Sequence, residues 1–187
     1  SIGKQDNSAS EFALAPDGYA DFLKHDFGWE DRSFVIGISD EKKDWPFVLP
    51  GPLDAWGGTS STAGIRTHVL NIFFRLEHIT TKNDSFKLII DLLDVAAENP
   101  PFFKVLVNGR SWKFKLPPGK NSKEPGGDLK EPLKHVIEIT LPKHLIRNGF
   151  NEIRLTNLEG SWIVFDDIRM EGPESVRSVL PVKSAFL

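Results

Sequence analysis

The chain has 187 residues, a net charge of −3 and no cysteine, with charges of both signs spread along its length. A chain of this size fits one domain and buries a core without disulfide staples. The composition excludes thiol catalysis and cysteine-ligated zinc, it argues against a basic nucleic-acid surface, and no apolar run approaches the ~20 residues of a membrane span.

The first third of the chain carries few regular signals. Residues 11–14 predict a short strand, and 17–26 predict one short helix because three apolar side chains share a face at i, i+3 and i+4. Residues 33–38 predict a strand. The stretch 40–62 predicts a long loop rich in Pro, Gly and Asp. Loops of this length in compact domains are usually functional or packed as an excursion.

The middle of the chain alternates apolar and polar residues with the period of a strand. Residues 68–76 and 85–94 each place four apolar side chains on one face, with a predicted turn at 81–84 between them. Two further runs, 102–107 and 110–116, flank Asn108-Gly109. Asn-Gly between strand-patterned runs predicts a hairpin, because a type I′ turn needs positive φ at both central residues.

The last third predicts three strands. Residues 135–141 form one strand, and 142–149 read as a single helical turn. The runs 149–158 and 161–172 predict a final hairpin. In the second run, four apolar residues at 162–165 follow Ser161 and precede Asp166 and Asp167, so the strand is predicted to be buried on both faces or to carry a bulge.

The expected fold class is all-β. About eight strands occur with no helix long enough for a crossover between parallel strands, which predicts an antiparallel β-sandwich, most consistent with a jelly roll. We expect this sandwich to span residues 1–172 and residues 173–187 to form a tail or linker toward a further domain.

Several short segments resemble a known family when taken in order. They are IGKQD at 2–6 with EF at 11–12, FVIGIS at 34–39 followed by DWPF at 44–47, VLVNG at 105–109, GFN at 149–151 and DI at 167–168. Their order and spacing resemble the third domain of family 4 polysaccharide lyases, the rhamnogalacturonan lyases, and galactose-binding-like jelly rolls more widely.

The resemblance implies a carbohydrate-binding-module-like domain that accompanies a catalytic domain. The catalytic residues of the lyases lie in a different domain to which nothing in this chain corresponds, so no catalytic residue is transferred and the isolated chain is not expected to be an enzyme. The implied partners are a polysaccharide or oligosaccharide and the catalytic domain of the parent chain, with no nucleic acid and no membrane. The expected location is extracellular or periplasmic.

The predicted sugar-binding residues lie in and just after the long loop. Sugar rings stack their apolar faces on Trp or Tyr and hydrogen-bond to surrounding polar groups. Trp45, Asp54, Trp56 and Arg66 supply these groups, and Trp56 is the best candidate because its neighbours are polar and glycine-rich. The competing interpretation is that each Trp plugs the loop onto the sandwich.

A structural calcium ion is the expected cofactor. Galactose-binding-like sandwiches often hold one Ca²⁺ near the chain ends, and oxygen ligands from an entry loop and the last strand suit this hard ion. Asp6, Glu11 and Asp167 are the predicted ligands, with Asp166 as an alternative to Asp167. The competing interpretation is that these carboxylates cap turns or pair with Lys4 and Arg169.

The sequence shows little sign of catalysis. Its five histidines have no metal-ligand spacing, and no nucleophile-elbow motif occurs. Asp91 and Asp94 point to opposite faces of a strand and cannot form a glycosidase pair unaided. The leading hypothesis is a non-catalytic module that contacts a pectic, rhamnogalacturonan-type glycan. The alternatives are a structural domain that packs on a catalytic domain, and an independent glycoside hydrolase.

Overall fold

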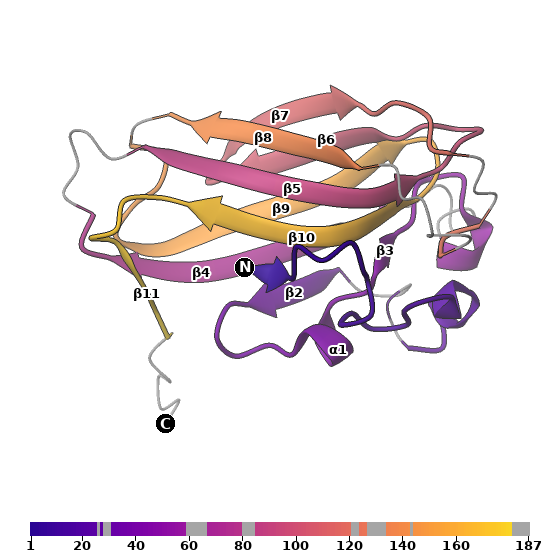
Figure 1. Ribbon diagram of the computed structural model, residues 1–187, viewed down its shortest axis with the longest axis horizontal. Coiled ribbons are helices and arrows are strands. Elements are labelled where there is room, and N and C mark those ends of the chain that lie inside the picture. The colour runs from indigo at the N-terminus through magenta and orange to yellow at the C-terminus, as the bar shows by residue number, and fades with distance from the viewer. Residues whose placement is uncertain are drawn as a thin grey trace.

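The protein is a sandwich of two β-sheets in the computed structural model (Figure 1). The structure describes residues 1–25, 27, 31–58, 67–79, 85–120, 124–126, 134–142 and 144–180. The predicted turn at 81–84 lies outside this set. Within it, no helix is long and apolar enough to cross a membrane. The predicted β-sandwich is confirmed.

The first sheet contains five strands. Four form a continuous path and the fifth, β3 (Val48–Leu49), also pairs with β10; the path runs β1 (Ile2–Gly3), β10 (Ile163–Glu171), β5 (Phe86–Val95), β8 (His135–Leu141). All of these pairings are antiparallel.

The second sheet contains six strands. Its path runs β11 (Arg177–Val179), β4 (Val69–Glu77), β9 (Gly149–Glu159), β6 (Phe102–Val107), β7 (Arg110–Lys115). The sixth strand, β2 (Arg32–Val35), pairs with β4 in parallel, so this sheet is mixed. Because β11 pairs with β4, the segment after residue 172 contributes a strand to the sheet.

The core lies between the sheets and follows the predicted alternation. In β4 the buried side chains are those predicted to face inward, Leu70, Ile72, Phe74 and Leu76. In β5 the predicted inward set, Phe86, Leu88, Ile90 and Leu92, is buried too, but β5 is also buried on its other face, where Ile89, Asp91 and Leu93 lie. Side chains between these positions point to the outer faces of the sandwich.

The hairpin predicted at Asn108-Gly109 is confirmed. Strands β6 and β7 pair antiparallel across these two residues. Asn108 has φ 45° and Gly109 has φ 91°, the left-handed values that a type I′ turn requires. The turn therefore fixes which side chains of the two strands face each other.

The hairpin predicted for the last two long strands is wrong. Strand β9 pairs with β4 and β6 in one sheet, whereas β10 pairs with β5 and β1 in the other. The connection at Gly160 crosses from sheet to sheet, and it does so over a tight approach of Gly160 to the backbone of Asn99 and Pro100. The predicted bulge in β10 is confirmed, because its register with β5 shifts on either side of Phe165.

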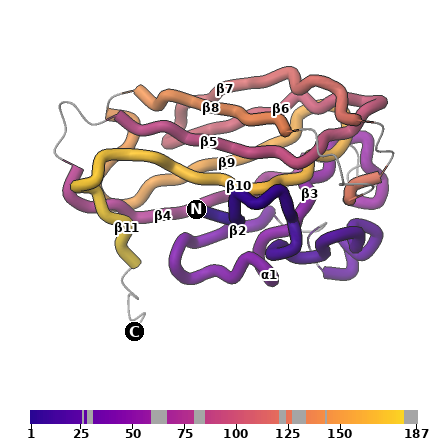
Figure 2. Tube along the Cα trace, in the orientation of Figure 1, coloured from indigo at the N-terminus to yellow at the C-terminus, as the bar shows by residue number. Residues whose placement is uncertain are grey.

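The helices are short. They are η1 (Gly18–Asp21), α1 (Glu41–Asp44) and η2 (Ala55–Gly57). The predicted helix at 17–26 is one 3-10 turn followed by turns, and the predicted strand at 11–14 is a single bridge from Ala13 to Pro46. The tube in Figure 2 shows these segments gathered below one end of the sandwich.

Candidate functional site: a polar recess on an exposed sheet face

The outer face of the first sheet carries charged side chains next to its centre. Asp167 on β10 and Asp91 on β5 are directly opposed partners in the antiparallel register, and Arg169 follows two positions later on the same face. The inward neighbours Ile168 and Ile90 bury the other face of the same strands. The strand period therefore delivers two carboxylates and one guanidinium to a single patch.

Arg169 bridges the two carboxylates. Its Nη1 donates to Oδ2 of Asp91 at 2.5 Å and to Oδ1 of Asp167 at 2.6 Å. Both acids are buried, Asp91 being 6% and Asp167 2% exposed. A buried pair of like charges is costly without a cation, so the guanidinium holds this pair together.

The pKa of Asp167 is raised to about 7, chiefly by burial and next by the hydrogen bond with Asp91, while the charge of Arg169 acts in the opposite direction. The hydrogen bond to Asp91 is the main reason why the pKa of Arg169 is raised. Asp167 is thus protonated in an appreciable fraction of molecules at neutral pH. The patch can exchange a proton with its surroundings near physiological pH.

One oxygen of the pair is not satisfied within the protein. Oδ1 of Asp91 is buried and has no hydrogen-bond partner among the described residues. Its other oxygen accepts from Arg169 and, at 3.4 Å, from Nε2 of Gln5. A buried acceptor left without a donor costs about 1–3 kcal/mol, so a donor from outside would bind favourably there.

Asp91 lines a recess of about 260 Å³ on this face. The recess lies between the entry segment, β5, β8 and β10, and its lining consists of Gln5, Asn7, Asp91, Leu92, Leu93, Lys134, His135, Val136 and Asp166. Asp166 accepts from the backbone N–H of Ser8, and burial raises its pKa. The volume is near the lower limit of about 300 Å³ for small-ligand pockets.

The lining can both donate and accept hydrogen bonds. The amides of Gln5 and Asn7 and the ammonium of Lys134 supply donors, whereas the carboxylates of Asp91 and Asp166 supply acceptors. Adjacent hydroxyl groups on a small polar molecule need such a mixture. The described lining holds no Phe, Tyr or Trp, and its one aromatic ring is the imidazole of His135, so recognition here depends mainly on hydrogen bonds.

The carboxylate pair is unsuited to glycoside hydrolysis. A hydrolase pair flanks the scissile bond with its carboxyl groups at least about 5 Å apart and leaves room for the sugar between them. Here one nitrogen atom of Arg169 contacts both Asp91 and Asp167, so the space between them is filled. The arrangement can anchor a ligand beside it, and it cannot enclose a glycosidic bond.

Trp45, one of the predicted sugar-binding residues, lies in the core. It is 0% exposed and packs edge-on against Phe34 and at a tilt against Phe165, with ring centroids 5.8 Å apart in each case. A fully buried ring offers no face to a sugar. Its position fits the competing interpretation of a plug between loop and sandwich.

Two of the other predicted sugar-binding residues, Asp54 and Trp56, anchor the loop. Asp54 is buried, accepts from the backbone N–H of Gly51 at 2.7 Å and from the hydroxyl of Ser161, and has a pKa raised by burial. Trp56 is half-buried and packs edge-on against Tyr19 and Phe22, with ring centroids 5.0 and 5.7 Å away. Arg66 lies outside the described residues.

The structure does not gather the three predicted calcium ligands. Glu11 accepts from the backbone N–H of Lys4 at 2.7 Å, Asp167 pairs with Arg169, and Asp6 is exposed. Across the described residues, no three histidine, aspartate or glutamate side chains are arranged to hold a metal ion. Calcium binding stays a prediction.

The recess was missed by sequence reasoning. Asp91 was noticed only as a partner of Asp94, and its true partner Asp167 is 76 positions away along the chain. The available signal was a carboxylate next to an apolar run in both β5 and β10, Asp91 after Leu88–Ile90 and Asp167 after Ile163–Phe165 with Asp166 between. Two such strands become neighbours only through the sheet order, which alternation does not specify.

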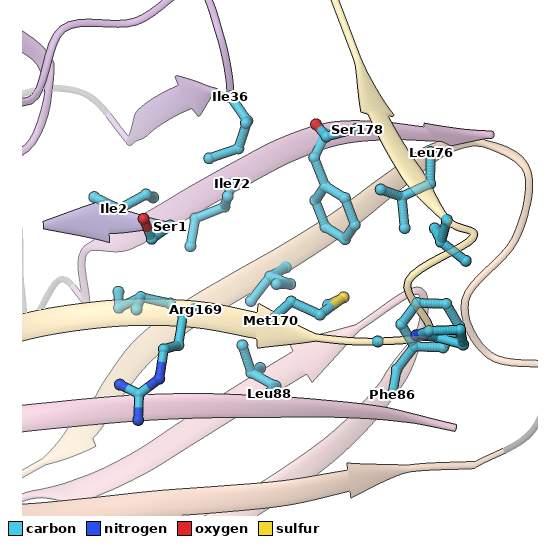
Figure 3. A pocket seen from close by; sticks show the side chains of 16 residues that line it. Ser1, Ile2, Ile36, Ile72, Leu76, Phe86, Leu88, Arg169, Met170 and Ser178 are labelled. Atoms are coloured by element: carbon cyan, nitrogen blue, oxygen red, sulfur yellow. The ribbon is translucent and has the colours of Figure 1, made fainter. Parts of the chain in front are cut away.

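A second cavity is apolar and lies between the sheets. It measures about 320 Å³ and is lined mainly by aliphatic and aromatic side chains, among them Ile72, Phe74, Phe86, Leu88 and Met170. Figure 3 shows Met170 pointing among these side chains, while the guanidinium of Arg169 points away from them. Met170 of β10 thus lines the cavity on one face of the sheet, whereas the guanidinium of its neighbour Arg169 contacts the carboxylate pair on the other face.

Together, the sandwich and the recess define a class of protein: a β-sandwich with a small polar recess on the outer face of one sheet. Residues 1–170 match the family model described as CBM-like, polysaccharide lyase family 4, domain III. The chain belongs to this family of carbohydrate-binding-module-like accessory domains of polysaccharide lyases.

A solved structure described as a family 35 carbohydrate-binding module from an environmental isolate is similar at 16% identity. The match covers 62% of this chain and 71% of that chain, with a TM-score of 0.39. No curated protein matches the chain.

Proposed function

We propose that this domain binds a plant-cell-wall glycan, of the pectic rhamnogalacturonan type, and holds the catalytic domain of a larger extracellular or periplasmic enzyme on it. Membership of the CBM-like lyase family supports glycan contact in general. We choose the recess as the binding site because Oδ1 of the buried Asp91, in its wall, has no hydrogen-bond partner among the described residues. A sugar hydroxyl is small and polar and can donate the hydrogen bond that this oxygen lacks.

The recess suits one sugar unit of a chain. Carboxylates of Asp91 and Asp166 accept from hydroxyls, and Gln5 and Lys134 donate to ring or hydroxyl oxygens. Arg169 fixes the Asp91 carboxylate in place before the ligand arrives. Weak affinity is expected for each site, because a few hydrogen bonds must offset the immobilisation of ligand and side chains.

The test compares two variants on the same sheet face. Gln5→Ala removes a donor of the recess, whereas Lys87→Ala removes a side chain on β5 that lies outside the recess and pairs with Glu138. Binding is measured by isothermal titration and affinity gel electrophoresis with rhamnogalacturonan and galactan fragments. Gln5→Ala should weaken binding about threefold to tenfold, since a hydrogen bond contributes about 0.5–1.5 kcal/mol net.

The outcome separates three cases. Reduced binding in Gln5→Ala with normal binding in Lys87→Ala supports the recess. Equal affinity in all three proteins would place the glycan elsewhere on the domain. An absence of binding to every pectic fragment would remove the glycan-binding function altogether.

A structural role in packing on the catalytic domain is the second candidate, and a specific feature favours it. Ile38 and Leu180 are 59% and 66% exposed, and Leu180 contacts the position of Gly37 next to Ile38. The apolar cavity opens near the same end, with Ile36 and Val176 in its wall. If the domain binds no glycan and Leu180→Ser releases it from its catalytic domain in the full-length enzyme, this second function holds.

A further inference from the structure

Three lysines lie together on the outer face of the second sheet, and we call them the basic ribbon: Lys104 on β6 with Lys113 and Lys115 on β7. Lys104 and Lys113 are directly opposed in the antiparallel register, and Lys115 is opposed to Phe102. The intervening Phe103 and Val105 of β6 are fully buried, so the lysines point outward. The geometry of the hairpin therefore places three ammonium groups on one surface. Figure 1 shows the backbone of the two strands, β6 and β7, that carry them.

This arrangement is electrostatically unfavourable in the isolated domain. Like charges directly opposite each other on a sheet repel. None of the three lysines makes an ion pair or hydrogen bond with any described residue. Elsewhere on the outer faces the charges are matched, as in Lys87 with Glu138 at 3.1 Å and Arg154 with Glu152 at 2.7 Å.

Protection of an exposed sheet edge explains only part of the ribbon. Strand β7 is the edge of its sheet, and lysine on an edge strand discourages aggregation. Strand β6, however, lies between β9 and β7, so Lys104 protects no edge. A repulsive pair that protects nothing points to a negatively charged partner that is absent from the isolated domain.

The surroundings of the ribbon fit a sugar polymer. Phe102 is half-exposed beside Lys115, and it offers an apolar surface next to a positive charge. Uronic acid units combine an apolar ring face with a carboxylate, which matches this pairing of aromatic and cation.

We propose that the basic ribbon is a second glycan-contacting surface, on the sheet opposite to the recess, and that it binds the carboxylates of an acidic polysaccharide. This inference rests on the proposed function and assigns the carboxylates of such a pectic ligand to a second surface of the domain. Nucleic acid fits less well, since the chain has a net charge of −3 and only this limited ribbon opposes it.

The test uses one polysaccharide backbone with and without its carboxylate charges. Polygalacturonate carries free carboxylates, whereas the fully methyl-esterified polymer carries the same sugars without charge. Binding of the intact domain is followed by isothermal titration and sedimentation with each polymer. The acidic form should bind at least about tenfold more tightly at low salt, and the difference should shrink as the Debye length falls from ~10 Å at 0.1 M to ~3 Å at 1 M salt.

Three single variants place the effect on the ribbon. Lys104→Glu and Lys113→Glu reverse one charge each, and Lys43→Glu on α1 makes the same change of net charge away from the ribbon. Both ribbon variants should bind polygalacturonate about tenfold more weakly, and Lys43→Glu should bind as the parent does. Glutamate also keeps a charge at the edge, so aggregation does not explain a loss.

Lys104→Glu gives a second readout that separates binding from folding. The new glutamate would face Lys113 as an opposite charge, so the melting temperature should stay equal or rise while binding falls. Loss of binding together with loss of stability would assign Lys104 to the fold instead. Unchanged binding of polygalacturonate in both ribbon variants would overturn the proposal.

The remaining outcomes distinguish this inference from the proposed function. If the ribbon variants bind neutral galactan normally and bind polygalacturonate as well as the parent does, the ribbon proposal fails and glycan binding stands. If the domain binds no glycan of any kind, the proposed function fails with it. Equal binding of polygalacturonate and duplex DNA would make the ribbon a general polyanion surface and contradict the glycan assignment.

Discussion

Removal of the cation between Asp91 and Asp167 should destabilise the domain strongly at alkaline pH. Arg169→Gln keeps the stem of the side chain and deletes the contacts of 2.5 and 2.6 Å to the two carboxylates. Asp91 and Asp167 are 6% and 2% exposed, so solvent replaces little of the lost interaction. Breaking a buried ion pair from one side costs about 3–5 kcal/mol, which is the loss expected at pH 8.

The loss should be smaller at pH 5. The pKa of Asp167 is raised to about 7, so at pH 5 this carboxyl is largely protonated and gains little from the cation. In the parent protein, the raised pKa adds stability that is complete below an unfolded pKa of about 3.9 and disappears as pH rises through about 7. Without Arg169 the pKa of Asp167 should rise further, which steepens the loss of stability toward alkaline pH.

Urea denaturation of both proteins at pH 5 and pH 8 measures the effect. Asp167→Asn is the control, because it removes the titrating group and should flatten the pH dependence of stability between about 4 and 7. In the double variant, Arg169→Gln should cost less than in the parent, since one of the two stranded charges is gone. An equal cost of Arg169→Gln at both pH values would refute the reasoning and leave Arg169 as a packing residue.

Two further predictions concern the loop and the metal. Trp45→Ala should lower the free energy of unfolding, measured by urea denaturation, by about 3–5 kcal/mol, because the ring is fully buried. Trp56→Ala should lower it less, because its ring is half-buried. A near-zero effect of Trp45→Ala would contradict the core position of its ring. For calcium, EDTA should lower the melting temperature and added Ca²⁺ should restore it if an ion binds between the entry segment around Asp6 and the last long strand. A melting curve that responds to neither EDTA nor Ca²⁺ would contradict the predicted calcium site.

Much of the fold could be predicted because it depends on local patterns. Alternation in β4 and β5 identified the inward side chains Leu70, Ile72, Leu88 and Ile90 without any knowledge of their partners. The turn at Asn108-Gly109 could also be predicted from the sequence, since it needs positive φ at two successive residues and few residue pairs adopt that conformation.

The failures arose where pairing is decided at long range. A strand period is the same whether the next strand lies in its own sheet or in the opposite one. The apolar runs of β9 and β10 therefore looked like a hairpin although they belong to different sheets. Only the bulge around Phe165, with burial on both faces of β10, indicated that this strand lies at the centre of a sheet.

The loop illustrates a different limit. Trp45 and Trp56 stand among polar residues in the sequence, and this neighbourhood favoured exposed rings. A loop that carries large aromatic residues, however, gains more by burying them, about 1.5–3 kcal/mol for a large apolar side chain. Asp54 then ties the same loop to Ser161, next to the crossing between β9 and β10. The polar residues that suggested a binding platform instead satisfy the hydrogen bonds of a buried excursion.

Function in this sandwich is therefore better sought on the sheet faces than in the loop. A flat outer face needs no charged residue to fold, and matched pairs such as Lys87 with Glu138 show how its charges are ordinarily balanced. The recess and the basic ribbon depart from that balance: Oδ1 of Asp91 has no hydrogen-bond partner among the described residues, and Lys104 opposes Lys113. The unpaired oxygen and the opposed lysines each lower the stability of the isolated domain. A glycan chain with hydroxyl donors and carboxylates would satisfy both, which is why the two surfaces are assigned to one class of ligand.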